Sequence, residues 1–183
     1  MNEKDKKNLS KFLSLILRHQ PETIQLTLDT NGWANVEELI HKAKRKRKIF
    51  SFDDLKEIVA TNDKKRFSFN DNQTKIRANQ GHSIQSINLN LTPITPPPFL
   101  YHGTVAKFMD SIRENGLQKM SRQHVHLSTN IETATKVGSR RGKPIILTVK
   151  SGAMFQEGYD FYKSENNVWL TPHVPVKFIE FKI

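Results

Sequence analysis

Residues 9–21, LSKFLSLILRHQP, decide how the chain begins to fold. The apolar residues of this stretch recur with the i, i+3, i+4 spacing of one buried helical face, at Leu9, Phe12, Leu13, Ile16 and Leu17. Pro21 disfavours helical geometry at the residue before it, so the helix must end there. The pattern predicts a core helix whose end carries Arg18 and His19.

Arg18 and His19 pair a guanidinium group with an imidazole at a fixed but solvated position. Arginine binds anions through two parallel N–H groups, and histidine titrates near neutrality, so the pair suits a phosphate under chemical attack. The alternative is a surface arginine next to a histidine that caps the last carbonyls of the helix. These two residues alone leave both interpretations open.

The composition indicates a polyanionic partner. The chain has 183 residues and a formal net charge of +11, which favours nucleic acid, although ribosomal contacts, heparin-like polymers and solubility remain open. The absence of cysteine excludes disulfides, thiolate zinc sites and cysteine nucleophiles. No signal-peptide pattern or membrane-length apolar run occurs, so we expect a cytoplasmic protein that does not bind membranes.

Three consecutive prolines mark the predicted boundary between two lobes, because proline favours an extended spacer. We expect one lobe over residues 1–92, a linker over 93–98 and a second lobe over 99–183. The first lobe continues with a helix from near Asn35, a helix over 52–60 begun by Ser51 or Asp53, and a hairpin of residues 66–69 and 75–78. Helices followed by a hairpin suggest a winged helix.

The second lobe is predicted to mix helices and strands, which makes the fold class α+β. Strands are expected over residues 99–102, 125–127, 145–149 and 176–181, where apolar and β-branched residues gather. A helix is expected over 105–115, closed by Gly116, and a short one over 131–137.

Several segments carry candidate anion ligands. Residues 78–83, ANQGHS, follow the hairpin, where a backbone nest and side-chain donors could hold a phosphate, the alternative being an ordinary polar turn. Residues 137–143, VGSRRGK, form either a phosphate clamp or a solvated loop. The basic block 44–48 is either a solvated loop or a contact to the phosphate backbone. The predicted contacts to RNA or its phosphate are Arg77, Gln80, His82, Ser83, Arg141 and Lys143.

Two further segments suggest a ligand site in the second lobe. Residues 101–104, YHGT, are expected between a strand and a helix, with Thr104 facing a ligand and Gly103 permitting its close approach. Residues 124–128, HVHLS, place two imidazoles on one strand face, where they could share a metal. We predict no metal site, because no carboxylate cluster accompanies them. The P-loop and Rossmann fingerprints do not occur.

Together these stretches closely resemble the RNA 2'-phosphotransferase family, whose members include the final enzyme of tRNA splicing. The resemblance rests on seven segments in family order, namely LSKFLSLILRHQP, DTNGWANVEELI, TNDKKRFSF, IRANQGHS, LYHGT, MSRQHVHLST and VGSRRGKP. It implies a winged-helix RNA-binding lobe followed by an NAD-binding lobe with the ADP-ribosyltransferase fold.

The resemblance also implies the roles of individual residues. The family's essential residues fall on Arg18, His19, Arg66 and Arg140, the last chosen over Arg141 because it occupies the arginine of the VGxR pattern. The NAD-contacting positions fall on His102, Gly103, Thr104, His126, Leu127, Ser128 and Val168. The family lacks the glutamate that protein-modifying ADP-ribosyltransferases commonly carry at the position of Val168, which agrees with a phosphate acceptor.

The implied activity transfers an internal RNA 2'-phosphate to NAD, a co-substrate, through an ADP-ribosylated RNA phosphate. The implied products are RNA with a 2'-hydroxyl, ADP-ribose 1'',2''-cyclic phosphate and nicotinamide. We expect a monomer that needs no metal. Two alternatives are an ADP-ribosyltransferase acting on nucleic-acid phosphate ends and a noncatalytic RNA-binding module.

Overall fold

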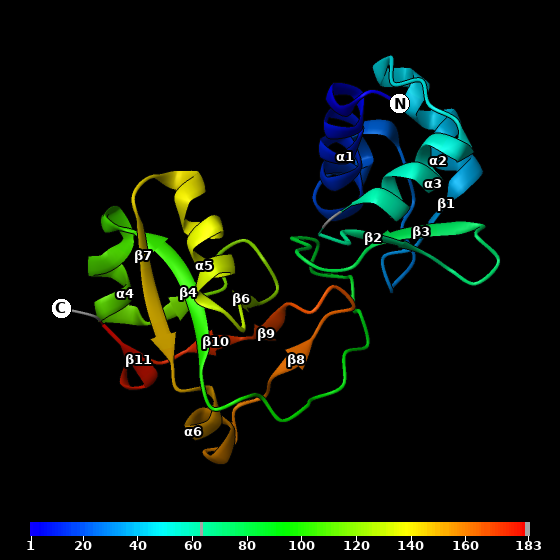
Figure 1. The fold of residues 1–183 in the computed structure, drawn as a ribbon. Helices are drawn as coiled ribbons and strands as arrows, with labels where there is room; N and C mark the ends of the chain where they lie inside the picture. Colours follow the sequence, from blue (N-terminus) through cyan, green and yellow to red (C-terminus); the bar gives the residue numbers. More distant parts are fainter. Residues whose placement is uncertain (63, 182–183) are drawn as a thin grey trace. The chain divides into compact units, whose positions relative to one another are not determined.

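The computed structural model describes residues 1–62 and 64–181. The chain divides into two compact units, Met1–Asn90 (unit 1) and Leu91–Ile183 (unit 2), and each has its own hydrophobic core. Both units combine helices with small antiparallel sheets (Figure 1), so the predicted α+β class is confirmed.

Unit 1 opens with the predicted helix, α1 (Glu3–Arg18). The Asn2 side chain caps its N-terminus by accepting from the Asp5 N–H, and all five residues of the apolar stripe are buried. His19 is the C-cap residue, and Pro21 begins the short 3-10 helix η1 (Pro21–Ile24). The helix therefore ends where the proline predicts.

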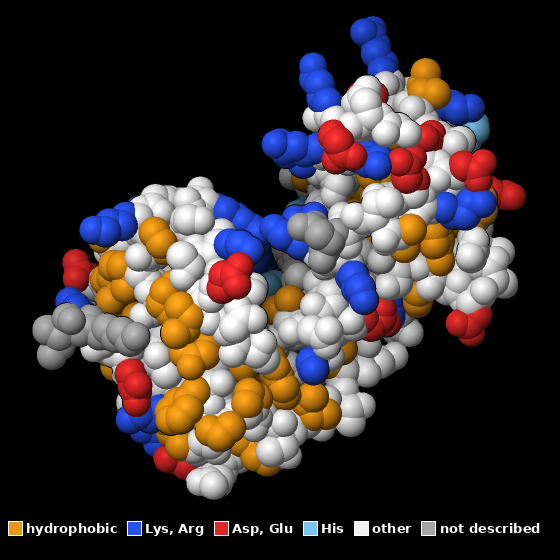
Figure 2. All heavy atoms as spheres, in the orientation of Figure 1, with side chains coloured by type: hydrophobic (Ala, Val, Ile, Leu, Met, Phe, Trp, Pro, Cys, Tyr) orange, Lys and Arg blue, Asp and Glu red, His pale blue; other side chains and the backbone are white. Residues whose placement is uncertain are grey.

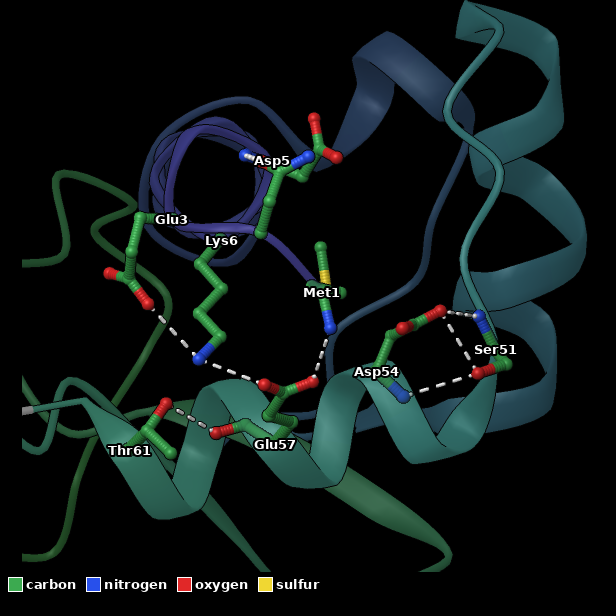
Figure 3. Close-up of polar contacts among 9 residues, drawn as sticks. Met1, Glu3, Asp5, Lys6, Ser51, Asp54, Glu57 and Thr61 are labelled. Atoms are coloured by element: carbon green, nitrogen blue, oxygen red, sulfur yellow. Dashed lines mark hydrogen bonds and ion pairs between the residues drawn. The ribbon is translucent and has the colours of Figure 1, made fainter.

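Two more helices complete the helical part of unit 1. Asn35 caps α2 (Val36–Ala43), which runs into the 3-10 helix η2 (Lys44–Lys46). Ser51 caps α3 (Phe52–Thr61), and Ser51 and Asp54 form a reciprocal capping box, drawn in Figure 3. The sequence left Ser51 and Asp53 as alternatives, and the structure selects Ser51.

A three-stranded antiparallel sheet closes unit 1. It has the order β1-β3-β2, formed by β1 (Ala34–Asn35), β3 (Lys75–Ala78) and β2 (Phe67–Phe69), so the predicted hairpin is confirmed. Its inward residues pack on the helices in one core. The fully buried members of that core include Leu13, Ile16, Leu17, Leu39, Leu55, Phe67 and Ile76.

Unit 2 contains two three-stranded sheets and a two-stranded one. The first has the order β11-β7-β4, formed by β11 (Ile179–Glu180), β7 (Pro144–Val149) and β4 (Leu100–Val105). The second has the order β6-β9-β8, formed by β6 (Val125–Leu127), β9 (Trp169–Thr171) and β8 (Tyr162–Lys163). The third pairs β10 (His173–Val174) with β5 (Leu117–Gln118).

Six short helices accompany these sheets. They are η3 (Ala106–Phe108), α4 (Met109–Asn115), α5 (Ile131–Gly138), η4 (Ser139–Arg141), α6 (Ser151–Gln156) and η5 (Val176–Phe178). Helix α5 packs on β4 and β7. None of the helices formed by the described residues has the length and apolarity needed to span a bilayer.

Two predicted elements of unit 2 differ from the structure. The helix expected over 105–115 is a 3-10 turn followed by α4, although Gly116 ends it with φ +71° as predicted. The strand expected over 176–181 is wrong for its first half, which is the 3-10 helix η5. Pro175 presets the turn with φ −61°, and its carbonyl accepts from the Phe178 N–H at 3.1 Å.

Residues 101–104 lie inside β4, not between a strand and a helix as predicted. Their backbone is paired with β7, and a Cβ at Gly103 would lie 1.8 Å from the Ala134 carbonyl oxygen in α5. On the side where a Cβ would point, the space is filled by α5, and the predicted contact of Gly103 with NAD stays a prediction. Glycine is required there for close packing of helix on strand.

The proline-rich segment is docked on unit 2 and is not a free spacer. The Ile94 N–H donates to the Phe161 carbonyl at 2.8 Å, and the Pro97 carbonyl accepts from the Ser151 hydroxyl at 2.6 Å. The Pro98 carbonyl accepts from the Gly152 N–H at 3.0 Å. The boundary between the compact units falls earlier, between Asn90 and Leu91.

Replacement of Gly103 by alanine tests the close packing of α5 on β4. We expect Gly103→Ala to lower the free energy of unfolding by about 3 kcal/mol, because backbone atoms of α5 must move to admit the methyl group. Gly158→Ala is the matched control, because no described atom lies within 4 Å of its Cβ position and only its φ of +91° opposes the change. It should cost about 1 kcal/mol. Urea unfolding measures both, and equal losses would contradict the packing argument.

Candidate functional site

The end of α1 meets the segment that follows the hairpin of unit 1. The Ser83 N–H donates to the Arg18 carbonyl at 3.0 Å, and the Ser83 Oγ lies 3.0 Å from His19 Nδ1. The two predicted anion segments, residues 9–21 and 78–83, are therefore held together. Gly81 has φ +87°, which supplies the turn between them.

Aromatic rings hold two arginines near this junction. The Arg18 guanidinium lies 6.0 Å from the Phe67 ring centroid, and the Arg77 guanidinium lies 4.4 Å from the centroid of Trp33. Such stacking fixes a planar guanidinium while it keeps its charge. Arg77 is half-buried, as is Arg18, so neither is an ordinary solvated surface residue.

His82 is buried near these groups, and its imidazole ring is neutral. It is 1% exposed, and neither ring nitrogen has a hydrogen-bond partner among the residues that the structure describes. Burial, and then the positive charges of Arg18, His19 and Arg77, lower its pKa to about 4. The ring is therefore neutral at physiological pH, and the predicted contact of His82 with RNA or its phosphate stays a prediction.

A cavity of about 710 Å³ in unit 1 brings Arg66 to the same site. It lies between α1 and α3, and both His19 and Arg66 line it. Arg66 Nη1 donates to Asn62 Oδ1 at 3.4 Å, at the end of α3. Three of the four predicted essential residues, Arg18, His19 and Arg66, thus come from two sequence segments to one region of unit 1.

The two predicted NAD segments of unit 2 also meet. Tyr101 and Ser128 exchange backbone hydrogen bonds of 2.8 Å, which joins β4 to the end of β6. His102 Nδ1 lies 3.0 Å from the His126 carbonyl oxygen. Burial lowers the pKa of His102, more than the His126 carbonyl raises it, and the charges of Arg122 and Arg141 act in the same direction as burial.

Arg122 belongs to this cluster, and the sequence interpretation missed it. Its Nη1 lies 3.2 Å from His126 Nδ1. Partial desolvation, and then the charges of Arg141 and Arg140, lower the pKa of its guanidinium, which nevertheless stays charged. The signal was present, because Arg122 stands in MSRQHVHLST, four residues before a predicted NAD contact.

The other predicted ligands occupy different surroundings. Arg140 and Arg141 lie exposed in η4, with the Arg141 guanidinium 5.7 Å from the Phe108 ring centroid, and Lys143 is exposed just beyond. Gln80 is half-buried beside His82 in the turn. Thr104 and Leu127 are 7% and 1% exposed, so their side chains belong to the interior.

The backbone of Val168 forms hydrogen bonds with Ser164. Its N–H donates to the Ser164 hydroxyl at 3.1 Å, and its carbonyl accepts from the Ser164 N–H at 3.0 Å. The next residue, Trp169, is 6% exposed, and its indole N–H has no hydrogen-bond partner in the described ranges. A buried N–H group of this kind can donate a hydrogen bond to a bound ligand.

The two histidines considered as metal ligands have separate partners. The His124 ring packs edge-on against Tyr162 with centroids 5.5 Å apart, whereas His126 faces Arg122. No group of three His, Cys, Asp or Glu side chains gathers as a metal site within residues 1–62 and 64–181.

The pKa of His82 predicts a specific loss of stability in acid. The unfolded ring binds a proton near its ordinary pKa of 6.5, whereas the folded ring does so near 4, so the stabilisation is complete above 6.5 and is lost as the pH falls toward 4. Between pH 7 and pH 5 the wild-type protein should lose about 2 kcal/mol more than His82→Asn. Urea unfolding at both pH values measures this difference, and identical losses would contradict a neutral buried His82.

Comparison with known proteins places the chain in a family. A model described as RNA 2'-phosphotransferase, Tpt1/KptA family, matches residues 4–173. The chain is 62% identical over 182 residues to a probable RNA 2'-phosphotransferase of Flavobacterium johnsoniae, covering 100% of both chains. It is 57% identical over 174 residues to the protein of the same description from Fusobacterium nucleatum, covering 94% of this chain and 97% of the relative. The chain therefore belongs to the RNA 2'-phosphotransferase, Tpt1/KptA family.

Proposed function

We propose that this protein removes a 2'-phosphate from an internal position of RNA, as at a tRNA splice junction, and transfers it to NAD. The observation that carries the proposal is the cluster of Arg18, His19 and Ser83 beside the cavity that His19 shares with Arg66. Family membership supports chemistry on an RNA 2'-phosphate. The use of NAD rests on the resemblance of the sequence motifs and on the side chains of unit 2.

The proposal assigns RNA binding to unit 1 and NAD binding to unit 2. The helices and the hairpin of unit 1 support a winged-helix RNA-binding lobe over 1–92, and the sheets of unit 2 support an ADP-ribosyltransferase-like lobe over 99–183, with 93–98 between them. The net charge of +11 favours RNA as the partner.

Arg18 and Arg66 bind and orient the 2'-phosphate in this proposal. Guanidinium groups stay charged at any physiological pH and contact two phosphate oxygens at once, so they hold the phosphate and stabilise the charge that develops when phosphorus is attacked. Ser83 fixes the His19 ring through Nδ1, so a proton would be exchanged with the RNA 2'-oxygen at Nε2. The ribose 2''-hydroxyl attacks phosphorus and releases its proton, the bond from phosphorus to the RNA 2'-oxygen breaks, and His19 protonates that oxygen as it leaves.

The side chains of unit 2 fit a dinucleotide. Arg122, Arg140 and Arg141 supply positive charge for a diphosphate, and His102 and His126 are fixed beside them. The buried indole N–H of Trp169 is a donor to which a ligand could bind. NAD, when bound, supplies a ribosyl carbon that a phosphate oxygen can attack while nicotinamide leaves as a neutral base.

Val168 is consistent with a phosphate as the nucleophile. A phosphate oxygen is already nucleophilic, so no carboxylate is needed to remove a proton from it. The residues of the site then act mainly by position and charge. Because arginines supply the positive field, we propose that no metal takes part.

A product assay tests the proposed function. With NAD and an RNA that carries one internal 2'-phosphate, we expect equal amounts of nicotinamide, ADP-ribose 1'',2''-cyclic phosphate and RNA with a 2'-hydroxyl, also in the presence of EDTA. Full recovery of the 2'-phosphate would refute the proposal. A stable ADP-ribosylated RNA would instead favour an ADP-ribosyltransferase, and RNA binding without affinity for NAD would favour a noncatalytic module.

Arginine substitutions test the two clusters. Arg18→Ala, His19→Ala and Arg66→Ala should each lower kcat by about 10²–10³, the cost of losing one donor to a developing charge. In unit 2 we expect Arg122→Ala to lose activity because the Arg122 guanidinium lies 3.2 Å from His126 Nδ1, and Arg140→Ala to lose activity as one of the four residues that the family resemblance makes essential. Wild-type turnover in Arg122→Ala would remove this residue from the site.

A further inference from the structure

The cavity of unit 1 extends beyond His19 and Arg66 along α1. Lys7, Lys11 and Ser14 line it at i, i+4 and i+7, which places them on one side of the helix. We propose that this groove binds the phosphate backbone of the RNA strand that flanks the 2'-phosphate. The inference rests on the proposed function, because it takes His19 and Arg66 as the place where the 2'-phosphate is held.

The positive charge of the groove favours binding of an RNA phosphate backbone. Lys6 is neutralised by Glu57 at 2.8 Å and Glu3 at 3.2 Å, as Figure 3 shows. Lys7 and Lys11 are exposed and form no ion pair with any residue of the described ranges. Among the described residues that line the groove, Glu3 is the one acidic residue, and Lys6 compensates it. Two uncompensated ammonium groups therefore face the groove beside His19 and Arg66.

The remaining lining residues suit a sugar–phosphate backbone. Ser10, Ser14 and Asn62 are half-buried and provide hydroxyl and amide donors of the kind that contact phosphate and ribose. Leu15 lines the same groove and is 39% exposed, which offers an apolar surface to a ribose or a base. The groove combines these polar and apolar contacts along one helix face.

The length of the groove exceeds one nucleotide. At the rise of an α-helix, Lys7 lies about 18 Å along the axis from His19. The 2'-phosphate alone would leave Lys7 and Lys11 unused, whereas a flanking strand would reach them. Figure 2 shows Lys and Arg side chains at several places on the surface of unit 1. The sequence also holds a basic block at residues 44–48. That block is not part of the cavity lined by His19 and Arg66.

The test compares two RNAs that carry the same internal 2'-phosphate, a dinucleotide and an oligonucleotide of about ten residues. The variants are Lys7→Ala/Lys11→Ala and the charge reversal Lys7→Glu/Lys11→Glu. The matched control is Lys44→Ala/Lys46→Ala, which removes the same charge from two exposed lysines outside the groove. Circular dichroism confirms that each variant is folded.

For the groove variants we expect the ratio of kcat/KM for the long RNA to that for the dinucleotide to fall several-fold, and further with glutamate. The salt dependence of binding to the long RNA should weaken by about 1.4 in log K against log salt, for two lost contacts to a single strand. The control variant should keep the wild-type ratio and slope.

An unchanged ratio in the groove variants, or an equal fall in the control, would overturn the proposal. If the wild-type protein leaves both RNAs unchanged, the proposed function fails instead, and the salt slopes still report whether the groove binds RNA. An unchanged slope in the alanine variant would overturn the groove in that case as well.

Discussion

The position at which α1 ends determines where unit 1 places Arg18 and His19. Five apolar residues bury one face of the helix, and Pro21 ends it, so Arg18 and His19 cannot shift along the chain without moving the core. Ser83 then joins that end to the segment after the hairpin through the Arg18 carbonyl and the His19 ring. Packing energy thereby fixes the positions of charged groups, which is the preorganisation that electrostatic binding of a phosphate requires.

Unit 2 achieves a similar rigidity by close packing of backbone on backbone. Gly103 lets α5 lie directly on β4, and the paired backbone of Tyr101 and Ser128 ties β4 to β6. His102 and His126 come together as a result, and Arg122 is placed against them. The cluster of His102, His126 and Arg122 thus rests on the backbone pairing of β4 with the end of β6.

The sequence predicted the elements whose signals are local. The apolar stripe of α1, the caps Asn35 and Ser51, and the hairpin were all readable, because each rests on residues a few positions apart. The 3-10 turn after Pro175 was missed because apolar β-branched residues in 176–181 mimic a strand. The roles of Gly103 and Arg122 depend on Ala134 and on His126 across the fold, and spacing alone does not encode such contacts. The family resemblance implied the roles of individual residues, whereas the burial and neutral state of His82 became visible only in the structure.

The burial of His82 has a thermodynamic consequence. Burial, and then the positive charges of Arg18, His19 and Arg77, oppose protonation of its ring, and the two guanidinium groups also repel one another. An anion that binds there relieves the repulsion, and by linkage whatever binds only the folded state also stabilises it. Binding of any such anion and the resistance of unit 1 to unfolding are therefore coupled, and the buffer anion becomes a variable of every stability measurement on this protein.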